Sequence, residues 1–229
     1  KWDMQFHPLK CEHVTFTRKT TKRANHTFHL HSTAIPKADK TKYLGVTINS
    51  KITWNDHISS VVAKANAALG FVRRNVITCS ETIRLTAYKQ LVRPLMEYAS
   101  AAWDSLPGTL ESSLESVQRR AARFICGILR TDHQTSTTSL LSKLDLDDLV
   151  SRRANARLRV FKQYHFSENN VILSHLQHAP APSVRRHCHQ YLIPHSNTLH
   201  HQRSYFVKTA KEWNTLPATS GFLVPPHAQ

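Results

Sequence analysis

Residues 42–58 read KYLGVTINSKITWNDHI, and within them the hydrophobic pattern changes from that of a strand to that of a helix. Residues 43–48 are rich in aromatic and β-branched side chains, which favour strands. After Trp54, apolar residues recur three and four positions apart, as on one face of a helix: Ile58, Val61, Val62, Ala65, Leu69 and Val72. The stretch predicts a sheet that ends near residue 50 and a helical region that follows it.

Two further apolar segments precede this stretch. Val14 and Phe16 alternate with threonines, and Phe28 and Leu30 alternate with other polar residues. Alternation with a period of two predicts a half-buried strand. We expect these two strands and residues 43–48 to form one small antiparallel sheet within residues 1–50.

Helical periodicity continues downstream to about residue 165. Ile83, Ala87 and Leu91 form an apolar stripe, which we expect Pro94 to break or kink because proline lacks a backbone N–H. Two later stripes have similar spacing: Leu110, Leu114, Val117, Ala121, Phe124 and Ile128, then Leu149, Ala154, Leu158 and Phe161. The predicted fold is α+β, with helical regions over 51–130 and 131–229 and a frayed tail rich in histidine and proline.

The chain is basic along its whole length. Its 31 lysines and arginines exceed its 15 aspartates and glutamates, which gives a net charge of +16 and a pI near 10.1. Because the excess is spread evenly rather than confined to a tail, nucleic-acid phosphates are the expected partners. The alternative is a basic protein that has no nucleic-acid function.

Other classes of function find no support in the sequence. The five glycines do not have the spacing of a phosphate-binding loop. No stretch approaches the length of a membrane span, so we expect no membrane partner. The four cysteines are far apart, as in reduced intracellular proteins rather than in disulfide frameworks.

Two clusters of basic residues lie on the predicted helices, opposite their apolar stripes. They are Arg119, Arg120 and Arg123, and then Arg152, Arg153, Arg157, Arg159 and Lys162. Guanidinium groups one and four positions apart form a compact surface for phosphates, so we expect both clusters to contact nucleic acid from the solvent side. A merely solvated helix face is the alternative for each cluster.

Six stretches resemble, in the same order, segments of the reverse transcriptases of LINE-type (non-LTR, jockey-like or CR1-like) retrotransposons. They are 2–11 (WDMQFHPLKC), 42–58, 88–100 (YKQLVRPLMEYAS), 115–125 (ESVQRRAARFI), 149–153 (LVSRR) and 213–217 (WNTLP). The resemblance covers residues 1 to about 217. His7 departs from it, because the family often has asparagine at this position.

The resemblance implies a role for each part of the chain. Residues 1–50 would be a remnant of the polymerase palm, 51–130 the helical thumb, and 131–229 a basic C-terminal extension. Tyr43, Leu44, Gly45 and Val46 would form a primer-grip-like hairpin, in which Gly45 permits close approach of the primer backbone. Lys10 would lie near the phosphates of the incoming nucleotide.

The resemblance also implies partners. These are RNA and DNA, as a template–primer duplex, and the fingers and palm that precede such a segment in a complete polymerase. The complete enzyme would use Mg²⁺, whereas we expect no cofactor for this chain. The family implies an intracellular protein of the nucleus or the cytoplasm.

Catalytic carboxylates are the feature that we do not find. Nucleotidyl transfer uses paired carboxylates that hold two metal ions, and in this family they lie before the segment where the chain starts. The only adjacent aspartates, Asp147 and Asp148, stand where a helix begins, which predicts a helix cap rather than a metal site. We therefore expect no catalytic residue, and a fragment that holds template–primer without polymerising.

Two other functions remain possible from the sequence. The first is a decayed or domesticated basic module that binds nucleic acid and has no polymerase role. The second is a zinc module built on the histidine-rich tail around His187, Cys188 and His189. Since the tail has no pair of cysteines at zinc-binding spacing, we expect no metal.

Overall fold

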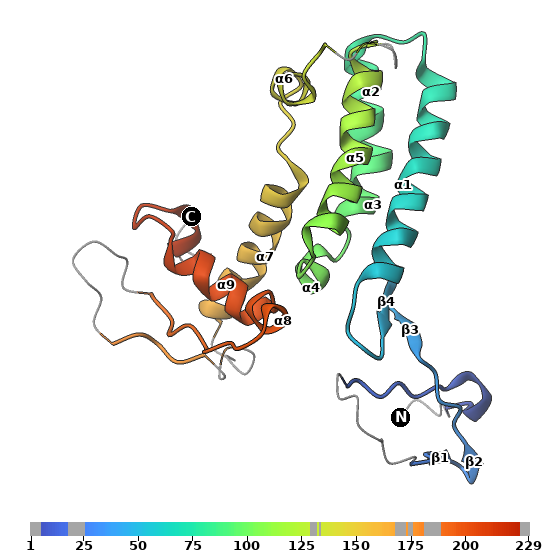
Figure 1. Cartoon of the computed structure of the whole chain (residues 1–229), viewed down its shortest axis with the longest axis vertical. Helices are drawn as coiled ribbons and strands as arrows, with labels where there is room; N and C mark the ends of the chain where they lie inside the picture. The colour runs from blue at the N-terminus through green and yellow to red at the C-terminus, as the bar shows by residue number, and fades with distance from the viewer. Residues whose placement is uncertain are drawn as a thin grey trace. The chain divides into compact units, whose positions relative to one another are not determined.

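The structure is a computed structural model that describes residues 6–17, 26–128, 132, 134–167, 173, 176–180 and 189–224. The chain divides into two compact units, Lys1–Ala63 and Lys64–Gln229. Most of the described residues are helical, and two small antiparallel sheets accompany them (Figure 1), which agrees with the predicted α+β class.

The first unit contains a short 3-10 turn, η1 (Pro8–Lys10), and two hairpins. The hairpin strands are β1 (His29–Leu30) with β2 (Thr33–Ala34), and β3 (Lys40–Tyr43) with β4 (Val46–Asn49). Both residues of each turn have positive φ angles, of 48° and 63° at His31 and Ser32 and of 44° and 85° at Leu44 and Gly45. Such two-residue turns match the right-handed twist of the paired strands.

The prediction of one sheet that joins three strands is wrong. Within the described residues each strand pairs only inside its own hairpin, and Val14 and Phe16 lie outside the strands. The tight turn at His31 and Ser32 reverses the chain immediately, so His29 and Leu30 pair with residues 33 and 34 instead of with the Val14 segment.

Helix α1 (Asn55–Val76) begins beside β4. The backbone N–H of Thr47 donates a hydrogen bond to Nδ1 of His57, with an N–N distance of 3.3 Å. The rings of Trp54 and His57 meet edge to face, with centroids 6.3 Å apart. The W-x-x-H stretch therefore fixes the start of α1 against the second hairpin.

The second unit continues α1 and is helical. Its further elements are α2 (Glu81–Ala87), η2 (Tyr88–Val92), α3 (Arg93–Glu97), α4 (Ser100–Trp103), α5 (Gly108–Ile125), α6 (Thr137–Lys143), α7 (Leu149–His165), α8 (Leu199–Gln202), α9 (Tyr205–Asn214) and the 3-10 turn η4 (Gly221–Leu223). Helix α5 packs on α2, α6 and α7, and α7 packs on α4 and α9 (Figure 1).

Pro94 changes the helix that precedes it without ending it. Residues 88–92 form a π-helical turn, and α3 continues through Pro94 to Glu97. Proline cannot donate to the carbonyl four residues earlier and its ring crowds that carbonyl, so the wider turn accommodates it. The chain breaks at Tyr98 and at Ala99, which has a φ of 52°, rather than at the proline.

The apolar stripe predicted for residues 83–91 is not the face that packs in the core. Ile83 and Leu91 are each 51% exposed, whereas Tyr88, Val92 and Met96 are completely buried. The helix has apolar residues on two faces, so spacing alone did not decide which face packs.

A separate apolar cluster holds α7, α9 and the segments between them. Phe161 and Trp213 pack at its centre with ring centroids 5.0 Å apart, and Phe161 also meets the ring of Tyr191. Trp213 Nε1 donates to the carbonyl of His189 at 2.7 Å, and the Asn214 amide bonds both the N–H and the carbonyl of Tyr191. The W-N pair thus fastens residues 189–191 to α9.

Candidate nucleic-acid interface

Helix α5 has one buried face and one cationic face. Leu114, Val117, Ala121, Ala122 and Ile125 are all completely buried. On the opposite face Arg119 and Arg120 are exposed and Arg123 is half-buried. The structure therefore brings the three arginines of the first predicted cluster together on one surface, and we call this surface the α5 arginine face.

Two of these arginines are held by backbone carbonyls. Nε of Arg120 donates to the carbonyl of Ser116 at 3.1 Å. Nη2 of Arg123 donates to the carbonyl of Asp132. A carbonyl carries no formal charge, so the hydrogen bond of Arg120 to Ser116 does not neutralise its guanidinium. Arg123 also lies near the Asp132 carboxylate, and the pKa of that carboxyl is lowered by a hydrogen bond from Thr135 and, less strongly, by the positive charge of Arg123.

A cavity of about 270 Å³ opens beside the α5 arginine face. The described residues that line it are Arg73, Arg120, Arg123, Phe124 and Ile128. Phe124 and Ile128 are its apolar lining residues and are half-buried, and the other three lining residues are arginines. The arrangement offers an apolar surface and positive charge to the same ligand.

The second predicted cluster is only partly exposed, and the solvent-side position expected for Arg153 and Arg157 is wrong. Both side chains are about 99% buried, and both pair with the buried carboxylate of Asp104. Nε of Arg153 lies 2.9 Å from Oδ1 of Asp104, and Arg157 also pairs with Glu212 of α9. Burial lowers the pKa of the Arg153 guanidinium. These two arginines serve packing and cannot reach a phosphate in this conformation.

The other members of that cluster have different surroundings. Arg152 forms a bidentate pair with Glu97, and this hydrogen bonding raises the pKa of its guanidinium. Nζ of Lys162 donates to the carbonyl of Gly221 at 2.8 Å. Arg159 is exposed. A continuous cationic face on α7 is therefore not formed.

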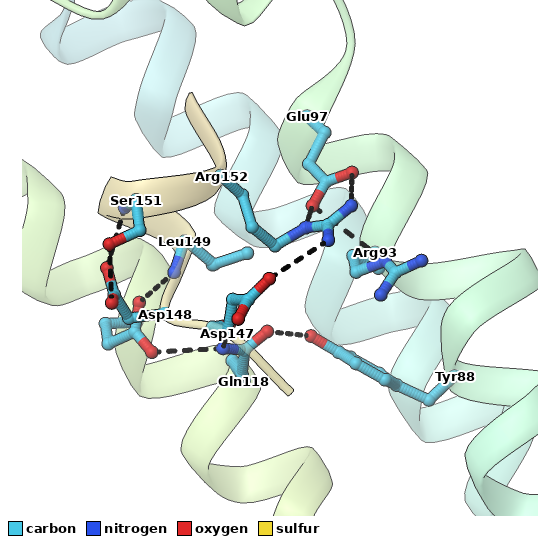
Figure 2. Close-up of polar contacts among 10 residues, drawn as sticks. Tyr88, Arg93, Glu97, Gln118, Asp147, Asp148, Leu149, Ser151 and Arg152 are labelled. Carbon is cyan, nitrogen blue, oxygen red and sulfur yellow. Dashed lines mark hydrogen bonds and ion pairs between the residues drawn. The ribbon is translucent and has the colours of Figure 1, made fainter. Parts of the chain in front are cut away.

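A buried polar network joins α5 to the start of α7 (Figure 2). The Tyr88 hydroxyl donates to Oε1 of Gln118 at 2.7 Å, and Nε2 of Gln118 donates to the carbonyl of Asp147 at 2.9 Å. Glu115 accepts from Gln118 and from the backbone N–H of Leu149. Burial raises the pKa of the Tyr88 hydroxyl. Three of the six resembling stretches meet here, so their polar residues hold the scaffold together.

Asp148 caps α7, as predicted. It accepts from the backbone N–H of Ser151 at 2.7 Å and from the Ser151 hydroxyl at 2.8 Å. Partial burial opposes ionisation, but these hydrogen bonds outweigh it and lower the pKa of the Asp148 carboxyl. Asp147 lies 3.8 Å from Nη1 of Arg152 (Figure 2). At the start of α7, Asp148 therefore accepts hydrogen bonds from Ser151, and Asp147 pairs with Arg152.

The primer-grip-like residues form the turn of the second hairpin. Tyr43 and Leu44 are 66% and 73% exposed, Gly45 is exposed, and Val46 is buried. Lys10 is exposed at the end of η1. Tyr43, Leu44, Gly45 and Lys10 are thus exposed to solvent. Their contacts with a primer or a nucleotide stay predictions.

Neither a candidate metal centre nor a membrane-spanning helix occurs in the described part of the chain. Within it, no group of three or more histidine, cysteine, aspartate or glutamate residues has the geometry to hold a metal ion. His187 and Cys188 lie outside the described residues. No helix in the described ranges is long and apolar enough to span a bilayer.

Two residues that shape this region, Arg73 and Asp104, are not among the predicted site residues. Arg73 lies in the last turn of α1, where a basic residue is ordinary because it complements the helix dipole. Asp104 stands outside any periodic pattern, in the loop after α4. Arg153 and Arg157 lie on the same side of α7 as its apolar stripe, because Arg157 stands four positions after Arg153 and four before Phe161. An arginine that is buried there requires an acidic partner, so this spacing could have predicted a buried acid, although not which one.

Fold and site together are those of a helical segment that has a cationic surface beside a cavity with apolar and basic lining residues. In sequence, this segment is similar to RNA-directed DNA polymerases of transposons. The chain spans less than a fifth of the length of the two relatives described below.

The similarity is to two proteins of Drosophila melanogaster. The chain is 24% identical over 132 residues to a probable RNA-directed DNA polymerase from transposon X-element, which is 56% of this chain and 14% of that protein. It is 20% identical over 169 residues to a probable RNA-directed DNA polymerase from transposon BS, which is 72% of this chain and 18% of that protein. No protein-family model matches the chain, and no solved structure matches it.

Proposed function

We propose that this chain is the segment of a LINE-type reverse transcriptase that holds the template–primer, and that the α5 arginine face contacts its phosphates. The exposure of Arg119 and Arg120 beside Arg123, on a helix whose other face is fully buried, is the observation that supports this proposal. The two polymerase relatives make nucleic acid the natural ligand for such a surface.

The α5 arginine face has the chemistry to bind the phosphate backbone of a nucleic acid rather than to recognise particular bases. Guanidinium groups present several N–H donors in a plane and match phosphate oxygens bidentately. Packing of the opposite face of α5 fixes the spacing of the three groups, which limits the entropy lost on binding. Binding is therefore expected to be independent of sequence and sensitive to salt.

The same proposal assigns the first unit to the primer end. The turn at Tyr43, Leu44, Gly45 and Val46 would contact the primer backbone, and Lys10 the phosphates of the incoming nucleotide. The fingers and the rest of the palm, with their Mg²⁺ ions, would be supplied by the remainder of the polymerase. Because Asp147 and Asp148 are engaged at the start of α7, this segment would not extend a primer by itself.

Binding to a labelled RNA–DNA hybrid tests the proposal. The variant R119A/R120A/R123A should lose about two decades of affinity at 0.1 M salt, if each arginine neutralises one phosphate. The control variant K51A/K64A/K211A removes three exposed lysines outside the face and gives the same net charge, +13 instead of +16. Equal losses in the two variants would show that only total charge matters, and would overturn the proposal.

A further inference from the structure

The cavity beside the α5 arginine face lies between two helices of the second unit. Arg73 reaches it from the last turn of α1, and Arg120, Arg123 and Phe124 reach it from α5. Its volume of about 270 Å³ is slightly below the usual range for drug-sized ligands. A ligand that fills it is therefore about the size of a single nucleotide.

Arg84 binds the backbone of Phe124, and the guanidinium groups of Arg84 and Arg73 both lie near the Phe124 ring. Nη1 of Arg84 donates to the carbonyl of Phe124 at 2.9 Å, and the Arg84 guanidinium lies 5.7 Å from the ring centroid. The guanidinium of Arg73 also lies 5.7 Å from the ring centroid, but the Arg73 side chain is exposed. Moving Arg73 aside costs little packing, so a planar group can reach the ring.

The lining of the cavity suits a base with its phosphate. Nucleobases stack on aromatic rings and on guanidinium planes, and such stacking is largely independent of sequence. The lining arginines supply donors for a phosphate attached to the same nucleotide. A base inside a duplex is already stacked and paired, so only an unpaired nucleotide can enter.

A second cavity extends the same surface. It has a volume of about 370 Å³ and is lined, among the described residues, by Gly70, Arg73, Arg74 and Ile77. Arg73 belongs to both cavities, and none of the described lining residues of either one is acidic. A strand that leaves the first cavity can therefore follow α1 past the guanidinium of Arg74.

We propose that the Phe124 cavity binds one unpaired nucleotide of a single strand, with the base against Phe124 and Ile128 and the phosphate at Arg73 and Arg123. This inference rests on the proposed function and makes it more specific, because it adds a single-strand site beside the surface that holds the duplex. Both RNA and DNA carry the required chemistry, and the test distinguishes them.

The test measures the binding of the full chain to three fluorescein-labelled probes: a uridine RNA dodecamer, a thymidine DNA dodecamer, and a blunt RNA–DNA hybrid of the same length. The variant F124L keeps an apolar side chain at this position but removes the ring. It should weaken single-strand binding by about five-fold or more, as expected for the loss of one stacked base, and leave hybrid binding within about two-fold.

An independent variant guards against misfolding of F124L. R73A removes an exposed guanidinium of the cavity, and K64A removes an exposed cation elsewhere on α1. R73A should weaken single-strand binding several-fold more than K64A does. A loss confined to the RNA dodecamer or to the DNA dodecamer identifies which strand the cavity accepts.

The outcomes separate this inference from the proposed function. If F124L and R73A leave single-strand binding unchanged, or lower single-strand and hybrid binding equally, the cavity is not a nucleotide site. If the wild-type chain binds the hybrid but neither single strand, the inference is overturned and the proposed function stands. If the wild-type chain does not bind the hybrid, the proposed function itself fails.

Discussion

The carboxylate of Asp104 neutralises cationic side chains from two helices. It is 3% exposed and pairs with Arg153 and Arg157 of α7 and with Lys208 of α9, whose Nζ lies 3.1 Å from Oδ2. Burial and the nearby Arg157 both lower the pKa of the Lys208 ammonium group. Since charges interact strongly away from water, this one residue controls whether α7 and α9 can pack.

The substitution D104N should therefore be severely destabilising. It takes the Asp104 carboxylate away from the buried Arg153 and leaves the buried Arg157 with its pair to the glutamate of α9. Removing one partner of a buried pair typically costs about 3–5 kcal/mol. Urea denaturation measures the change in the free energy of unfolding. The control is E81Q, which removes the exposed Glu81–Lys143 pair and should change stability by less than about 1 kcal/mol. Similar effects of the two substitutions would contradict the role assigned to Asp104.

Tyr191, which is buried, and Tyr205, which is half-buried, predict how stability depends on alkaline pH. Burial raises the pKa of Tyr191 and that of Tyr205 to about 12. A hydroxyl whose pKa is raised by folding stabilises the folded state fully below its unfolded pKa of about 10, and this stabilisation is lost as the pH rises through 12. We expect stability to fall between pH 10 and pH 12.

Absorbance of tyrosinate and circular dichroism, recorded together, check this expectation. Tyr88, Tyr191 and Tyr205 should ionise late, in parallel with the loss of helicity. The variant Y191F/Y205F should lose the part of the late phase that these two residues contribute and keep the part from Tyr88. Ionisation of every tyrosine near pH 10, while the helices remain intact, would show that the hydroxyls of Tyr191 and Tyr205 are not buried.

At the scale of the elements, the helices were more predictable than the strands. The stripes on α5 and α7 have a strong period, and six of their ten predicted residues are buried: Leu114, Val117, Ala121, Leu149, Leu158 and Phe161. The other four, which include Phe124 and Ile128, are half-buried. The hairpin at His31 and Ser32 was missed because neither residue is typical of a turn with positive φ. For the helix that contains Pro94, the wrong apolar face was predicted to be buried. The π-helical turn just before Pro94 could not be predicted, because it has no characteristic spacing of apolar residues.

The buried arginines show why the site was only partly predictable. Spacing placed Arg119, Arg120 and Arg123 on one face, because helix geometry alone decides that. The pairing of Arg153 and Arg157 with Asp104 joins residues 49 or more positions apart, and no local pattern records such a pair. The cavity at Phe124 depends in the same way on Arg73 of a distant helix.

The two hairpins should be the least protected ordered part of the chain. Their strands have two to four residues, and among the described residues each sheet has only two strands. Isolated two-stranded hairpins are marginally stable, and their open edges favour association. In hydrogen exchange, amides of β3 and β4 should exchange much faster than amides of α5. Comparable slow exchange in a protein that stays monomeric at high concentration would contradict this expectation.

At the scale of the whole molecule, the basic residues are of two kinds. Some arginines, such as Arg153, neutralise buried acids and stabilise the second unit. Others, such as Arg119 and Arg120, remain at the surface on a rigid helix. The net charge of +16 therefore overstates the number of cations available to nucleic acid. Their placement, rather than their total, should govern binding.

The dependence of binding on salt tests this central claim most directly. The affinity of the wild-type chain for a blunt RNA–DNA hybrid is measured at several salt concentrations, beside R119A/R120A/R123A and K51A/K64A/K211A. Each duplex phosphate contacted contributes about −0.9 to the slope of log affinity against log salt. We expect the arginine variant to lower the magnitude of the slope by about two to three units, while the lysine variant leaves it unchanged. An unchanged slope in the arginine variant would show that α5 does not contact the phosphates.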